Sequence, residues 1–128
     1  MTRLPFALAL ALAWIAPSPA AAPAAAPAAS ATVTLSSYRY NPGPIYLPGG
    51  VPVRLILVNG AGKTHDFTAE KFFRSARILQ GRTRGGTVSL RAGESRVIDL
   101  IPARGTYKVH CGEFGHRMFG MSTMIIVG

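Results

Sequence analysis

Short apolar runs separated by turns that contain glycine or proline fill the chain from about residue 32 to its end. TVTLSSYRY alternates apolar and polar residues, as a half-buried strand does, whereas VPVRLILVNG is almost continuously apolar, as a central strand is. Between them, NPGPIYLPGG carries three prolines and predicts turns or a sheet edge. TVSL, SRVIDLI, TYKVHC and STMIIVG predict four more strands. Strands this short and this closely spaced predict an all-β sandwich or barrel.

One segment has the periodicity of a helix. In TAEKFFRSARIL the apolar side chains recur at helical spacing, at Ala69, Phe72, Phe73, Ala76 and Leu79. Thr68 comes directly before them and is a residue type that caps helices. The sequence therefore predicts one short helix, capped by Thr68, with its apolar face against a sheet.

The first thirty residues differ in composition from the rest. Residues 1–20 combine Arg3, a short apolar run and small residues, which is the pattern of a cleaved signal peptide. Residues 21–31 contain mainly alanine and proline and predict a linker without a core of its own. The expected folded domain is residues 32–128, and the protein is expected to be exported, to the periplasm or beyond the cell.

The chain is strongly basic, with a formal charge of +9 that falls to +8 once Arg3 is removed. The basic residues are scattered along the domain, and export argues against a nucleic acid as the partner. A solvated surface explains the scattered charge most simply, and the functional alternative is steering toward an acidic protein or an anionic membrane.

A single cysteine, Cys111, stands among residues that bind soft metals. It cannot form an internal disulfide, and a metal would protect it in an oxidising compartment. His116 and Met121 follow it in a C-x4-H-x4-M pattern, and His65 comes after the predicted central strand. In TYKVHC, the period of two points Cys111 inward with Val109 and turns His110 outward.

These four side chains fit one copper ion best. Two imidazoles, a thiolate and a weak thioether make the trigonal electron-transfer arrangement, which needs no open position for a substrate. Zinc is disfavoured because structural zinc sites rarely use methionine. A Cys–His hydrolase lacks an orienting third group, and a binuclear copper centre would need a second cysteine.

The whole domain resembles the cupredoxins, the type 1 blue copper proteins, and in particular small exported bacterial plastocyanin- or rusticyanin-like domains. The matching segments are YNPGPIYLPGGVPVRLILVN, THDF and GTYKVHCGEFGHRMFGMSTMIIV. The resemblance implies a Greek-key β-sandwich or barrel. It also implies that His65, Cys111 and His116 are equatorial copper ligands and that Met121 is the axial ligand.

Two positions depart from the pattern of the resembling family. Asp66 stands where many members have asparagine, which ties the two ligand loops together, and Gly112 follows the cysteine where a hydroxyl residue is common. A carboxylate at position 66 can still accept backbone N–H groups. Its charge would favour oxidised copper and lower the reduction potential.

The expected function is transfer of single electrons between redox partners, by a monomer that is not an enzyme and has no small-molecule substrate. Partners that are acidic or membrane-associated would dock on an apolar rim made by Phe114, Met118 and Phe119. The alternative function is a copper chaperone or buffer, which Met118, Met124 and His110 near the ligand loop would serve.

Overall fold

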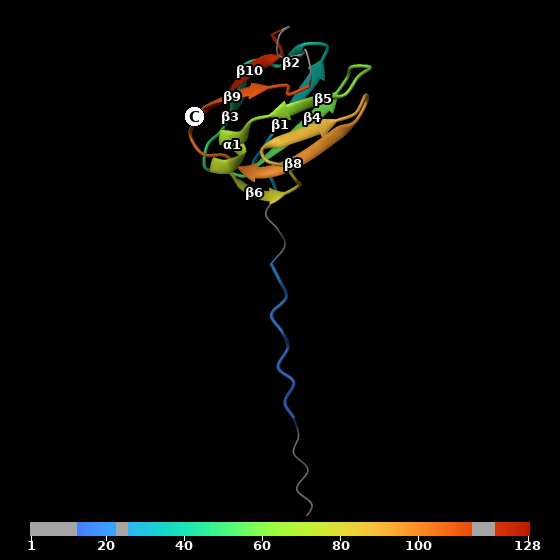
Figure 1. The fold of residues 1–128 in the computed structure, drawn as a ribbon. Helices are drawn as coiled ribbons and strands as arrows, with labels where there is room; N and C mark the ends of the chain where they lie inside the picture. The colour runs from blue at the N-terminus through green and yellow to red at the C-terminus, as the bar shows by residue number, and fades with distance from the viewer. Residues whose placement is uncertain (1–12, 23–25, 114–119) are drawn as a thin grey trace, which may run out of the picture.

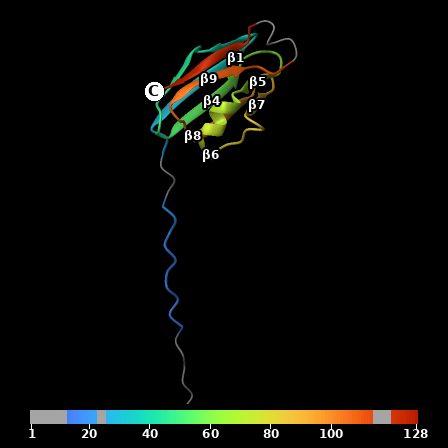
Figure 2. The same cartoon turned by 60° about the vertical axis from the view of Figure 1, so that its left-hand side comes forward.

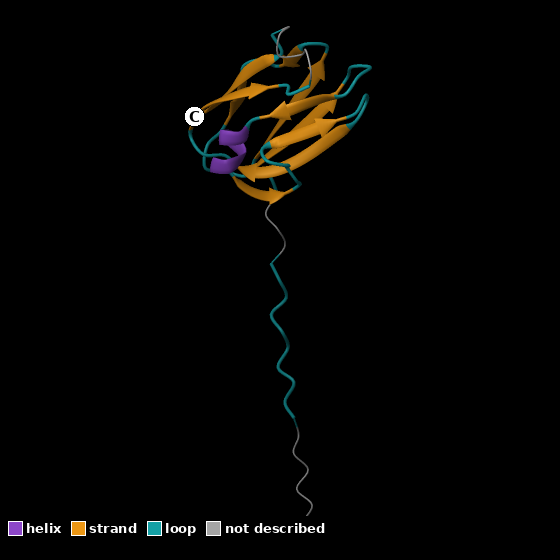
Figure 3. Ribbon diagram, viewed as in Figure 1, coloured by secondary structure: helices purple, strands orange, loops and turns teal. Residues whose placement is uncertain are grey.

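The computed structural model describes residues 13–22, 26–113 and 120–128. In this part of the chain, ten strands form two five-stranded sheets that pack face to face, with one short helix at the side (Figures 1 and 3). The all-β sandwich with a single short helix is thus confirmed. Among the described residues, no helix is long and apolar enough to cross a membrane.

The first sheet has the strand order β2-β1-β4-β8-β6. Its strands are β1 (Ala29–Ser36), β2 (Arg39–Asn41), β4 (Val53–Asn59), β6 (Arg77–Gln80) and β8 (Ser95–Ile101). β4 is the middle strand, as its apolar sequence predicts, and buries every second side chain. β1 begins at Ala29, three residues before the expected start of the domain, because it runs parallel to β4 from that point.

The second sheet has the order β3-β10-β9-β5-β7. Its strands are β3 (Ile45–Leu47), β5 (His65–Thr68), β7 (Thr87–Leu90), β9 (Gly105–His110) and β10 (Ser122–Val127). β3 forms an edge within the proline-rich segment, as expected. β5 lies between β7 and β9, so the histidine that begins it is carried by the interior of a sheet (Figure 2).

The helix is shorter than its sequence predicts. α1 spans Glu70–Ser75, and Ala76 is already extended, with φ −80° and ψ 151°. The predicted cap is wrong as well, since the N-cap is Ala69 and no side chain caps it. After Ala76 the chain forms β6, which pairs with β8 and leaves Leu79 exposed.

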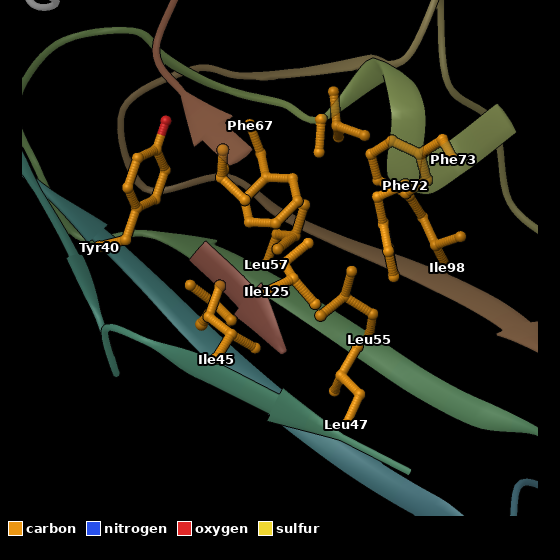
Figure 4. Close-up of a cluster of buried hydrophobic side chains, with 14 of the residues drawn as sticks. Tyr40, Ile45, Leu47, Leu55, Leu57, Phe67, Phe72, Phe73, Ile98 and Ile125 are labelled. Carbon is orange, nitrogen blue, oxygen red and sulfur yellow. The ribbon is translucent and has the colours of Figure 1, made fainter. Parts of the chain in front are cut away.

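Aromatic rings fill the space between the sheets beside α1. Phe72 and Phe73 of α1 are buried and pack edge to face, with ring centroids 5.2 Å apart. Phe73 contacts Phe67 of β5, and Phe67 in turn contacts Tyr40 of β2 at 5.7 Å (Figure 4). These contacts fix β5 against both the helix and the opposite sheet, which sets the position of the histidine at its start.

Candidate metal centre

His65 is held at the first position of β5, with 2% of its surface exposed. The turn before it is tied down by Asn59, whose side-chain amide donates to the carbonyl oxygens of Lys63 (2.8 Å) and Leu90 (3.0 Å). The Asn59 amide oxygen also accepts the Ala61 N–H at 3.0 Å. A buried imidazole in a turn fixed at both ends has little freedom to leave its place.

Cys111 follows β9 and is fully buried. Its Sγ lies 4.0 Å from His65 Nδ1, so the pairing of β5 with β9 brings together two residues that are 46 positions apart. Val109 is buried and His110 only half-buried, which confirms the predicted inward orientation of the cysteine.

The surroundings of Cys111 favour the protonated form of its thiol in the metal-free protein. Burial raises the pKa of Cys111, and the nearby carboxylates of Asp66 and Glu113 add to the rise. The backbone N–H groups of Asp66 and Glu113 act in the opposite direction, and the Asp66 N–H lies 3.4 Å from the sulfur. A metal that binds here as a thiolate complex therefore releases a proton.

Met121 is buried, directly before β10, and its backbone is hydrogen-bonded to that of the cysteine. Its carbonyl oxygen accepts the Cys111 N–H at 3.1 Å. The structure thus brings His65, Cys111 and Met121 to one end of the sandwich. His116 lies outside the described residues, as do Phe114, Met118 and Phe119 of the predicted rim.

Asp66 ties the two ligand-bearing segments together. Its carboxylate accepts the Gly112 N–H at 2.8 Å and 3.0 Å, one contact to each oxygen. The prediction that a carboxylate here would accept a backbone N–H is confirmed. A Cβ atom at Gly112 would lie 3.2 Å from Asp66 Oδ2, so the absence of a side chain there permits this close approach.

Two supporting residues were not predicted from the sequence. The hydroxyl of Thr68 donates to Asp66 Oδ1 at 2.7 Å, so the expected helix cap instead supports the carboxylate. The hydroxyl of Tyr40 donates to the Asp66 carbonyl at 2.6 Å. No sequence signal identifies either role, because both depend on strands that are brought together only by the fold.

The comparisons with known proteins agree with this architecture. The cupredoxin-like domain family matches residues 5–127. The chain belongs to the cupredoxin-like domain family. None of the curated proteins compared with this cupredoxin matches it in sequence.

Solved structures share the cupredoxin fold at low sequence identity. Auracyanin B is 21% identical, with a TM-score of 0.60, and the match covers 82% of this chain and 92% of that one. Reduced auracyanin from the photosynthetic bacterium Roseiflexus castenholzii is 18% identical (TM-score 0.60; 81% and 99% covered). A multicopper oxidase from Campylobacter jejuni is 14% identical (TM-score 0.63), but the match to 82% of this cupredoxin spans only 31% of the oxidase.

The separation of the His65 and Cys111 donor atoms fits a single first-row metal ion. With metal–nitrogen and metal–sulfur bonds of about 2.0 and 2.3 Å, two ligands of one ion lie within about 4.3 Å of each other. The 4.0 Å between His65 Nδ1 and Cys111 Sγ meets that limit. In the described ranges, no three His, Cys, Asp or Glu side chains cluster as a metal site. The described donors of this cupredoxin are therefore one imidazole, one thiol and one neighbouring thioether, a set that suits copper.

Proposed function

We propose that this protein is an exported mononuclear copper protein that carries single electrons between redox partners and is not itself an enzyme. The observation that carries the proposal is the close, buried approach of His65 Nδ1 to Cys111 Sγ, with Met121 beside them. The overlap with almost the full length of two auracyanins supports a small stand-alone protein of this kind.

His65, Cys111 and Met121 would hold the ion, together with His116 from the sequence motif. Copper, when bound, supplies one-electron redox chemistry. The protein holds its donor atoms in place: Asp66 accepts the Gly112 N–H and, through its own N–H, contacts the cysteine sulfur. Burial of His65 and Cys111 would keep water away from a bound ion.

Copper loading with optical detection tests the proposal. Protein loaded with Cu(II) should show intense visible absorption from thiolate-to-copper charge transfer, and Cys111→Ser should abolish it. Met124→Leu is the matched control and should keep the colour, because Met124 is half-buried on the outer face of β10. A colourless wild-type complex with copper bound would contradict the proposal.

Copper handling is the second candidate function, and the surroundings of its extra donors disfavour it. His110 and Met124 line the same outer depression, but Lys71 and Lys108 line it too, against a single carboxylate, that of Glu70. Two ammonium groups beside an incoming copper ion repel it. An electron carrier should give reversible voltammetry and retain its metal, whereas a chaperone should release Cu(I) quickly to a competing chelator.

The partners and location are part of the same proposal. Export would follow from residues 1–20, and the periplasm is the compartment proposed. Docking is proposed on the rim of Phe114, Met118 and Phe119, beside His116, by acidic or membrane-associated redox proteins that meet a monomer with a charge of about +8.

A further inference from the structure

An arginine-lined depression of about 550 Å³ lies beside β7, the strand paired with β5. It is formed by β7, by β8 and by the turn that leads into β7. Its polar lining consists of Arg82, Thr83, Arg84, Thr87, Ser89 and Arg96. No carboxylate is among the described residues that line it, and of its three guanidinium groups only that of Arg96 forms an ion pair in the described part of the chain, with Glu94.

Two of these arginines are available for a ligand. Arg96 Nε is paired with Glu94 at 2.8 Å, whereas Arg82 and Arg84 take part in neither ion pair found in the described part of the chain. Guanidinium groups bind carboxylate and phosphate oxygens in pairs through their planar fork of N–H donors. The volume is many times the roughly 30 Å³ that one water molecule occupies in the liquid, so an oxyanion fits within it.

The turn that carries Arg84 is fixed by its backbone. Arg84 and Thr87 exchange both hydrogen bonds, at 2.9 and 3.0 Å. Gly85 and Gly86 between them have φ values of 58° and 81°, which glycine adopts without strain. A Cβ at Gly86 would lie 2.5 Å from the Glu70 Cα, so α1 packs directly against the turn. A site on a rigid turn loses less conformational entropy when a ligand binds.

A chain of hydrogen bonds leads from this depression to the metal centre. Thr87 Oγ1 lies 2.9 Å from Thr68 Oγ1, and Thr68 in turn donates to Asp66 Oδ1. Since the single hydroxyl proton of Thr68 is given to the carboxylate, Thr87 must be the donor to Thr68. Asp66 accepts the N–H of Gly112, the residue that follows Cys111. The wall of the depression and the cysteine loop are thus joined by three successive contacts.

We propose that this depression is an oxyanion-binding site, taking a phosphate or carboxylate group on Arg82 and Arg84, and that the bound anion acts on the cysteine loop through Thr87, Thr68 and Asp66. An anion beside Thr87 competes for its hydroxyl proton and so weakens the support of the Asp66 carboxylate. The site is separate from the proposed copper ligands, and its occupancy can be measured with or without the metal.

Amide chemical shifts of the ¹⁵N-labelled protein test the binding. Inorganic phosphate and a short capped glutamate peptide are titrated separately, to distinguish a free anion from one presented by a partner. Saturable shifts at Arg84 and Thr87 with either probe are expected, and the probe that binds more tightly identifies the source. The double variant Arg82→Gln/Arg84→Gln should weaken binding at least about tenfold.

Two further variants make the test specific. Arg104→Gln removes the same kind of charge from an exposed position directly before β9 and should leave binding unchanged. Thr87→Val keeps the arginines and should retain binding, but should abolish the shift that the anion causes at Gly112. Absence of saturable shifts with both probes, or equal losses in Arg104→Gln and the double variant, would overturn the site. Binding without any shift at Gly112 would overturn the coupling. Neither result bears on the copper colour test, so failure here is distinct from failure of the proposed function.

Discussion

Asp66 is the residue on which the hydrogen bonds of the metal centre converge. Its carboxylate binds Gly112 and Thr68, its carbonyl accepts the Tyr40 hydroxyl, and its N–H points at the Cys111 sulfur. The two positions that depart from the family pattern are in direct contact here. A Cβ atom at Gly112 would lie 3.2 Å from Asp66 Oδ2, so a side chain at position 112 would press on the side chain at position 66.

Asp66→Asn is expected to raise the reduction potential of the copper-loaded protein. The asparagine oxygen can still accept the Gly112 N–H, so the metal-free protein should lose about 1 kcal/mol of stability or less. The negative charge that favours oxidised copper is removed. Voltammetry measures the shift, with Glu70→Gln, an exposed carboxylate on α1, as a control that should move the potential less. An unchanged or lower potential in Asp66→Asn would show that the carboxylate does not act on the ion through its charge.

Gly112→Ala is expected to destabilise the metal-free protein by about 1–2 kcal/mol, because its Cβ presses on the Asp66 carboxylate. The control is Gly62→Ala, since a Cβ at Gly62 meets nothing within 4 Å. Both changes reduce the freedom of the unfolded chain equally, so the difference between their urea midpoints isolates the contact. Equal midpoints would mean that the loop moves aside without penalty.

At the scale of elements, the strands were more predictable than the ends of the helix. The apolar side chains of TAEKFFRSARIL fit helical spacing as far as Leu79, yet the helix ends at Ser75. The residues after the helix form β6 instead, because their backbone groups can hydrogen-bond to β8. Local periodicity gives no information about such a partner strand. The same limit hid the role of Thr68, because a threonine before a helix is by itself a good cap.

Tyr40 joins the two sheets at the metal centre. It belongs to β2 of the first sheet, and its buried hydroxyl donates to Asp66 of β5 in the second. Tyr40→Phe leaves the Asp66 carbonyl without this donor and should destabilise the protein by about 1–3 kcal/mol. Tyr46→Phe, at a residue 69% exposed on β3, is the control and should be nearly neutral. Urea unfolding measures the stability of both variants. Equal stabilities of Tyr40→Phe and Tyr46→Phe would show that the Tyr40 hydroxyl does not stabilise the contact between the sheets.

Arg54 and Asp99 form a cross-strand pair between β4 and β8, with two contacts of 2.8 Å. The hydrogen bond from Arg54 lowers the pKa of Asp99 below its ordinary value, although burial opposes the shift. A carboxyl group whose pKa is lower in the folded state than in the unfolded state stabilises the protein at pH values above its unfolded pKa, near 4. This stabilisation is lost as the pH falls through the pKa of the folded state. Asp99→Asn should therefore be less stable than wild type at pH 7, with the gap closing toward pH 3 in urea unfolding. A gap of constant size across that range would contradict the linkage.

At the scale of the whole molecule, the sandwich brings residues 65, 111 and 121 to one end. The sequence predicted the class of fold, and it predicted that His65 would reach the cysteine if the central strand and the cysteine-bearing strand were neighbours. Those two strands, β4 and β9, lie in different sheets. His65 reaches the cysteine because it begins β5, a strand that the sequence did not predict and that pairs with β9. It did not predict that β1 runs parallel to β4 or β3 parallel to β10. Strand partners depend on contacts between distant segments, which local periodicity does not encode.

The core and the metal centre make separable contributions to the stability of the whole protein. The buried cluster extends from Val33 to Val127 and needs no metal to pack, so the metal-free protein should be folded. Copper that binds only the folded state should then stabilise it by mass action, by about 4 kcal/mol when free copper is a thousand times the Kd. The measurement is thermal unfolding at several copper concentrations, in which the Tm should rise steadily for wild type and hardly at all for Cys111→Ser. An equal rise in both proteins would place the stabilising copper elsewhere on the surface, because the serine variant keeps every exposed donor and loses only the buried thiol at the end of β9.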